Sequence, residues 1–194
     1  MATSVSEKSK KLSRLFAFLI VVGMIAMVFG YFGPIIHKSG TTFDAGSSVS
    51  KLVDEDKDLR KKGAEDIAET GTTNKTGFKG VGALQFFSKM VFVLGIVTVV
   101  WFILLCVLYI ENPELIYLVI GGLTVLASIL SFIFVLIVLS SYRKYYGTLP
   151  GYEDVSVFGL GFGAICLPIG GLLFGGGTAG MALTTPKVEV LHKG

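Results

Sequence analysis

The sequence lacks charged residues where a soluble protein of its size would carry them. Only 16% of its 194 residues are Asp, Glu, Lys or Arg, whereas 52% are hydrophobic. Four long blocks contain no charged residue and no histidine, over residues 15–36, 90–110, 115–142 and 155–183. At about 1.5 Å per helical residue, each block covers a hydrocarbon core of about 30 Å. The sequence therefore predicts an all-α integral membrane protein with four antiparallel transmembrane helices in a left-handed bundle.

Residues that carry out catalysis or bind metals are also scarce. Ion-coupled transport and proton relays usually need an ionisable side chain inside a span, and no span has one. His37 lies at a membrane edge and His192 in the tail, and neither has a Cys or carboxylate at metal-ligand spacing. Cys106 and Cys166 lie deep in apolar blocks, where thiols are usually small buried hydrophobes. We therefore predict no catalytic residue, no cofactor, no metal and no enzyme activity.

The hydrophilic segments are unequal in length. A long hydrophilic loop at 37–89 separates the first two spans. The other segments are short: a basic tail at 1–14, a tight turn at 111–114, a loop at 143–154 and a tail at 184–194. The net charge is only +3 and no basic patch is interleaved with aromatic residues, so nucleic acid is excluded as a partner. The predicted partners are the lipid bilayer and other membrane proteins or further copies of the chain.

The orientation follows from basic residues beside the spans. An even number of spans places both termini on one side, and the basic residues of the two sides are nearly balanced. The first span usually dominates, and its N-terminal flank contains Lys8, Lys10, Lys11 and Arg14. Asn74 begins an Asn-x-Thr sequon, which would be glycosylated only on a luminal or extracellular face. We therefore expect cytoplasmic termini, in the plasma membrane or an endomembrane.

Within the long loop, charged residues predict a surface helix over 51–70. Pairs such as Asp56 and Arg60 recur at a spacing of four residues, which supports a helix. A thin apolar stripe of Leu52, Leu59 and Ile67 is too narrow to bury much surface. We expect a break near Gly63. The segment is either a partner-docking helix or a solvated spacer.

The fourth span is rich in glycine. In lipid, helices associate by close packing, and glycines four residues apart let two backbones approach. The predicted helix-packing residues are Gly23, Gly30, Gly121, Gly122, Gly159, Gly163, Gly171, Gly175, Gly176 and Gly180. They either pack the protein's own bundle or recruit another subunit. Pro168 predicts a kink, and a helix broken between Leu167 and Gly171 would be typical of a transporter site.

The layout resembles the claudin and peripheral-myelin-protein group of tetraspan proteins. The order is span, long loop, span, tight turn, span, short loop and span, and Leu84-Gln85 before the second span is similar to claudins. Claudins carry a Trp and a Cys pair in the first large loop, whereas this loop has neither and the only tryptophan is Trp101. The cysteine pair of that family's disulfide-linked extracellular sheet is therefore missing from this loop, and the resemblance is one of layout.

Taken together, these features predict a non-enzymatic tetraspan protein that acts through protein–protein contacts. It would be a membrane organiser, a junction or adhesion protein, or a structural subunit of a membrane complex. One alternative is a small channel or transporter component that uses a broken fourth helix. A membrane enzyme is the second alternative.

Overall fold

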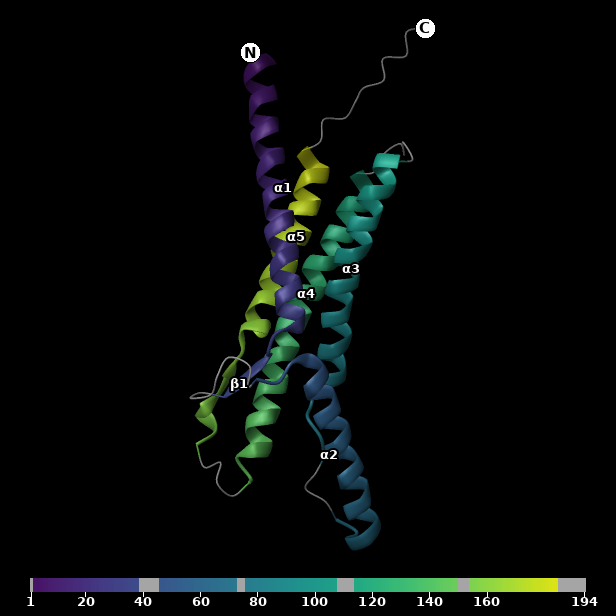
Figure 1. The fold of residues 1–194 in the computed structure, drawn as a ribbon, viewed down its shortest axis with the longest axis vertical. Helices are drawn as coiled ribbons and strands as arrows, with labels where there is room; N and C mark the ends of the chain where they lie inside the picture. Colours follow the sequence, from purple (N-terminus) through teal and green to yellow (C-terminus); the bar gives the residue numbers. More distant parts are fainter. Residues whose placement is uncertain (1, 39–45, 73–75, 108–113, 150–153, 185–194) are drawn as a thin grey trace.

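The computed structural model describes residues 2–38, 46–72, 76–107, 114–149 and 154–184. Four of its helices are long and apolar enough to cross a membrane (Figure 1). They are α1 (Ala2–Phe32), α3 (Val81–Val107), α4 (Glu114–Tyr146) and α5 (Phe162–Thr184). A fifth helix, α2 (Val49–Thr70), is hydrophilic. The prediction of a helical, membrane-embedded chain with several spans is confirmed.

The spanning helices pack in the order α1, α5, α4 and α3. Glycines of α5 lie against α1 on one side and against α4 on the other. On the far side of α4, the rings of Phe87 in α3 and Phe134 stack at 5.5 Å. The start of α1 and the end of α5 lie at one end of the bundle, and α2 projects from the opposite end (Figure 1). A sequence-remote pair, the first and last helices, therefore forms one side of the bundle.

Two short strands continue this pair of helices. Strand β1 (Ile36–Lys38) follows α1, and β2 (Phe158–Leu160) precedes α5 after a short 3-10 turn. The strands are antiparallel, with Ile36 opposite Leu160 and Lys38 opposite Phe158. The fourth predicted span therefore starts later than expected, because residues 158–160 pair with β1 instead of joining the helix.

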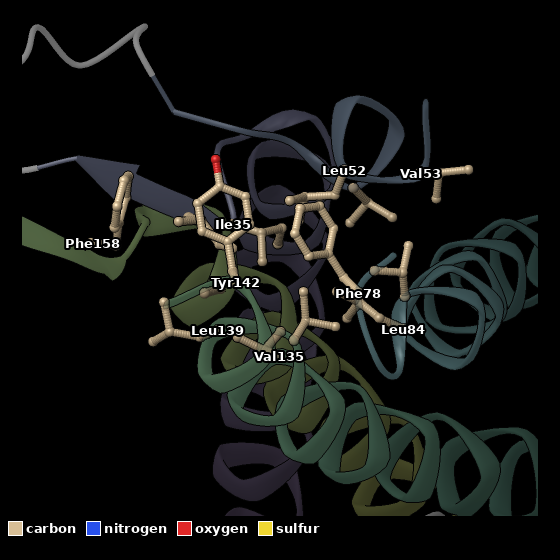
Figure 2. Close-up of a cluster of buried hydrophobic side chains, with 14 of the residues drawn as sticks. Ile35, Leu52, Val53, Phe78, Leu84, Val135, Leu139, Tyr142 and Phe158 are labelled. Carbon is tan, nitrogen blue, oxygen red and sulfur yellow. The ribbon is translucent and has the colours of Figure 1, made fainter. Parts of the chain in front are cut away.

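A second hydrophobic core lies outside the four-helix bundle. We call this region the cap, and it comprises residues 35–38 with β1, β2, α2, residues 76–80, the first turns of α3 and α5 and the last turns of α4. Its buried side chains come from all of these elements (Figure 2): Ile35, Ile36, Val49, Leu52, Val53, Leu59, Phe78, Val81, Leu84, Val135, Val138, Leu139, Tyr142, Phe158 and Ala164. Burial of these residues supplies the main driving force for folding of the cap.

The cap explains why two spanning helices are longer than predicted. Helix α3 begins at Val81 rather than at residue 90, because Val81, Leu84 and Ser88 are buried. Helix α4 continues to Tyr146, and its last turns bury Val138, Leu139 and Tyr142. The apolar block alone marks the hydrocarbon segment, whereas packing in the cap decides where each helix ends.

Helix α2 also differs from the sequence-based expectation. It is continuous through Gly63, which is buried, so the predicted break is wrong. Leu52 and Leu59 are buried in the cap core, although their stripe was predicted to be too narrow to bury much surface, and Ile67 is 53% exposed beyond the core. Gly71, with φ 74°, ends the helix as a left-handed C-cap whose N–H donates to the carbonyl of Ile67.

Candidate functional site: the glycine seams and the cap

The first glycine seam joins α1 to α5. Gly30 and Gly23 of α1 lie against Gly163 and Gly170 of α5, and Gly177 of α5 lies against Ile20 and the backbone of Phe16. Within each helix these glycines are seven residues apart. Seven residues are close to two helical turns, so each set lies on one face. A Cβ on Gly170 would lie 2.5 Å from the backbone nitrogen of Met27. The two backbones are therefore in direct contact, and larger side chains are excluded.

The second glycine seam joins α5 to α4. A Cβ on Gly121 would lie 2.6 Å from the carbonyl oxygen of Gly175, and the reverse distance is the same. Gly171 lies against the hydroxyl of Ser128. Gly180, in contrast, packs on the ring of Phe16 in α1. Most of the predicted glycines are thus used within the chain's own bundle.

Three predicted packing glycines are placed differently. Around Gly122, Gly159 and Gly176, no atom of the described residues lies within 4 Å of the position that a Cβ would take, apart from the adjacent residues and the backbone of the same helix. Gly159 also belongs to β2 rather than to a helix. Of the predicted packing glycines in the described helices, Gly122 and Gly176 are therefore the two that remain on the outer surface of the bundle.

Helix α5 is continuous through Pro168. It is helical from Phe162 to Thr184, and Pro168 is buried in its interior. The hydroxyls of Thr124, Ser128 and Thr178 donate to backbone carbonyls one turn earlier, at 2.7–2.8 Å. The broken helix on which the transport alternative depended is therefore absent from the described part of α5.

Asp56 fastens α2 to the segment that leads into α3. Its carboxylate accepts a 2.6 Å hydrogen bond from the backbone N–H of Phe78 and a 2.8 Å hydrogen bond from Arg60 Nε. The Asp56 side chain is 12% exposed, whereas that of Arg60 is 58% exposed. Gly77 adopts a φ of 75°, and a Cβ there would lie 2.5 Å from Asp56 Oδ1. A glycine is needed at this position, both for the backbone conformation and for access to the carboxylate.

The sequence predicted the pairing of Asp56 with Arg60 but not the burial of Asp56. The charge pattern gives the spacing along the helix, and it does not say which charged residue faces the core. The contacts of Phe78 explain why Asp56 is the buried one. The Phe78 ring packs on Tyr142 with a centroid distance of 5.0 Å, and this places the Phe78 N–H against the Asp56 carboxylate.

The end of α4 is fastened to the other cap elements. The Tyr146 hydroxyl donates a 2.5 Å hydrogen bond to Glu55 of α2. Arg143 donates from Nε to the carbonyl oxygen of Phe158 in β2 at 2.7 Å, and its Nη2 reaches the same oxygen. The hydroxyl of Ser141 accepts a 2.9 Å hydrogen bond from the N–H of Lys79. These contacts hold the cap as a fixed unit on the end of α4.

Burial raises the pKa of the Glu55 carboxyl above its usual value near 4.5, although its hydrogen bond from Tyr146 opposes the shift. A carboxyl whose folded pKa is raised binds a proton more tightly when folded, so cap stability falls as pH rises from about 4.5 through the folded pKa. Glu55→Gln should keep an acceptor for Tyr146 and remove this pH-dependent loss. Amide hydrogen exchange of α2 between pH 4 and 7, in wild type and variant, would measure how the stability of the cap depends on pH. An unchanged pH profile in the variant would contradict this role of Glu55.

The outer face of α2 is charged and exposed. Within the described residues its Asp, Glu, Lys and Arg side chains are exposed except Asp56, which is buried, and Glu55 and Asp66, which are half-buried. Lys57 and Asp54 form an exposed ion pair at 3.7 Å, which contributes little stability. The face is therefore available for contact with other molecules.

The predicted histidines, cysteines and glycosylation site do not form a site together in the described part of the chain. His37 is half-buried in β1, and Cys166 is a half-buried free thiol. Among the residues that the structure describes, no group of three His, Cys, Asp or Glu could hold a metal ion. Asn74 and His192 lie outside the described residues, as does the side chain of Cys106.

No family model, no curated protein and no solved structure matches the chain. The likeness in layout to claudins therefore stays a prediction from the sequence. The structure gives a membrane-embedded chain with four candidate spans and a folded cap.

Proposed function

We propose that this chain is a non-enzymatic tetraspan protein that acts through protein contacts made by its cap. The observation that carries the proposal is the arrangement of α2. One face of this helix is fixed on the cap core through Leu52, Leu59 and Asp56, and the opposite face displays charges to the solvent. A rigid charged helix loses little conformational entropy on binding, which favours its use as a recognition surface.

The arrangement in the membrane belongs to the same proposal. The four spans cross antiparallel, the termini face the cytoplasm and the cap faces the lumen or the outside of the plasma membrane or an endomembrane. Two contacts support an antiparallel bundle: Gly30 lies by Leu167 and Gly23 by Phe174, so that positions fall along α5 as they rise along α1. The basic flank of α1 supports the orientation.

Site-specific photo-crosslinking in native membranes tests this function. A benzophenone amino acid in place of Lys62, which is exposed on α2, should form discrete protein adducts. The same probe in place of Leu172, exposed on the apolar α5, is the matched control and should label lipid. If probes along the outer face of α2 give no protein adduct in cells that express the chain, the proposal is wrong.

A further inference from the structure

Four exposed charges form one row along α2. Lys57, Lys61, Glu65 and Glu69 are spaced by four residues, so they are neighbours on one ridge of the helix. All four are exposed. Read from the base of α2 to its tip, the row has two positive charges followed by two negative charges.

The charges within this row do not stabilise α2 by pairing with one another. Lys57 does pair with Asp54 outside the row, at 3.7 Å, but that ion pair is exposed and contributes little stability. Lys57 and Lys61 are like charges at a spacing of four, as are Glu65 and Glu69, and such pairs destabilise a helix. Lys61 precedes Glu65, which is the weaker orientation for an ion pair within a helix. The last turn contains no basic residue, so Glu69 meets the negative end of the helix dipole without compensation. The row is therefore better explained by a partner with the opposite order of charges.

The same row has that opposite order when it is read in reverse. We propose that α2 binds α2 of a second copy of this chain in an antiparallel pair, with Lys57 of each copy against Glu69 of the other and Lys61 against Glu65. A two-fold axis near residue 63 repeats both pairs, so one contact forms four ion pairs. This inference rests on the proposed function and identifies the partner of the cap.

The direction of α2 places the second copy in a facing membrane. Helix α2 leads away from the bundle at the end opposite the start of α1 (Figure 1). Two copies in one membrane point the same way, so their rows run parallel and place lysine against lysine. An antiparallel pair forms when two copies face each other from two membranes. The contact thus joins membranes rather than neighbours within one membrane.

The fixed position of α2 makes such a contact effective. The hydrogen bonds from Phe78 to Asp56 and from Tyr146 to Glu55 hold the base of the helix on the cap. Single exposed ion pairs are weak, but many copies on two surfaces act together. The contact depends on charge, so salt weakens it.

Vesicle clustering tests the inference with the full chain. The protein is reconstituted in phosphatidylcholine vesicles, protease digestion verifies that caps face outward, and light scattering measures clustering. Wild-type vesicles should cluster, and about 1 M salt, with a Debye length of about 3 Å, should disperse them. Reversal of the basic half in K57E/K61E should reduce clustering about tenfold or more, since avidity multiplies the loss. K51E/K144E changes the net charge equally at exposed positions outside the row and should cluster normally.

A full exchange of the row gives the sharpest result. K57E/K61E/E65K/E69K has an unchanged net charge, and its row is again self-complementary in the antiparallel sense. It should cluster with itself but not with wild-type vesicles. Clustering of the exchanged and wild-type chains as strong as that of wild type alone would overturn the antiparallel pair. Wild-type vesicles with verified outward caps that stay single would also overturn it. Protein adducts from Lys62 that persist in that case would leave the proposed function standing.

Discussion

Gly30→Leu should prevent the chain from forming a stable folded bundle. The new side chain would meet the backbone of Leu167 and Cys166 on α5, at positions closer than any Cβ contact allows. A backbone cannot move aside as a side chain can, so the cost exceeds the usual range of about 1–3 kcal/mol for overpacking. A protein with a total stability of roughly 5–15 kcal/mol loses much of it. Size-exclusion chromatography in mild detergent should show aggregate in place of a monodisperse peak.

Gly176→Leu is the matched control for this prediction. Gly176 does not lie on that seam: it belongs to α5, the same glycine-rich helix as Leu167, but outside its own helix and adjacent residues none of the described residues has an atom within 4 Å of a Cβ placed there. Its replacement should leave the elution profile and the melting temperature nearly unchanged, or raise the latter because glycine is a poor helix former. Equal damage from both variants would show that the loss comes from leucine in the span rather than from the α1–α5 seam.

Asp56→Ala should release α2 from the cap. The substitution leaves the buried N–H of Phe78 without an acceptor, which costs about 1–3 kcal/mol. Because Phe78 has no exposed surface, water cannot replace the carboxylate without opening the core. Hydrogen exchange of residues 49–63 and 76–84 should increase at least tenfold, which corresponds to about 1.4 kcal/mol of lost protection. The spanning parts of α1 and α5 should exchange as before.

Two variants separate this hydrogen bond from a simple loss of charge. Asp58→Ala removes an exposed carboxylate two residues further along the same helix and should not change exchange in the cap. Asp56→Asn keeps an oxygen acceptor for Phe78 and should lose only part of the protection. If Asp58→Ala loosens the cap as much as Asp56→Ala does, the net charge of α2 rather than the buried hydrogen bond holds the cap.

The four spans could be predicted because the hydrocarbon core imposes both length and composition. Every backbone polar group inside lipid must be paired within the helix, so an uncharged block of this length has one structural solution. The ends of the helices could not be predicted in this way. Val81 and Tyr146 lie outside the apolar blocks, and their helical state depends on packing in the cap between segments far apart in sequence.

The glycine partners could have been predicted in part. A search for glycines four residues apart selects Gly159 and Gly163, of which the first lies in a strand. A spacing of seven selects Gly23 and Gly30 in α1, and the same spacing recurs in α5, as a helix seam between two long helices requires. Uniform hydropathy still does not tell which helix faces which, because lipid and protein interiors are equally apolar.

The sequence did not predict the cap because its core residues come from several segments that are far apart in the chain. Leu52 and Leu59 give only a thin stripe, and the strands contribute three residues each. The core forms when these weak signals meet Phe78, Tyr142 and Phe158 from three other segments. No local pattern contains this information, since the contacts are non-local.

The pairing of the first helix with the last has a consequence for biosynthesis. Helix α1 ends at Phe32 and its partner α5 begins at Phe162, so at about 5–20 residues per second the ribosome needs on the order of ten seconds to supply that partner. During this interval Gly23 and Gly30 face lipid or the insertion machinery instead of a neighbouring backbone. A nascent chain that stops before Phe162 therefore has an open seam, which a membrane chaperone or a quality-control protease can recognise as unfinished.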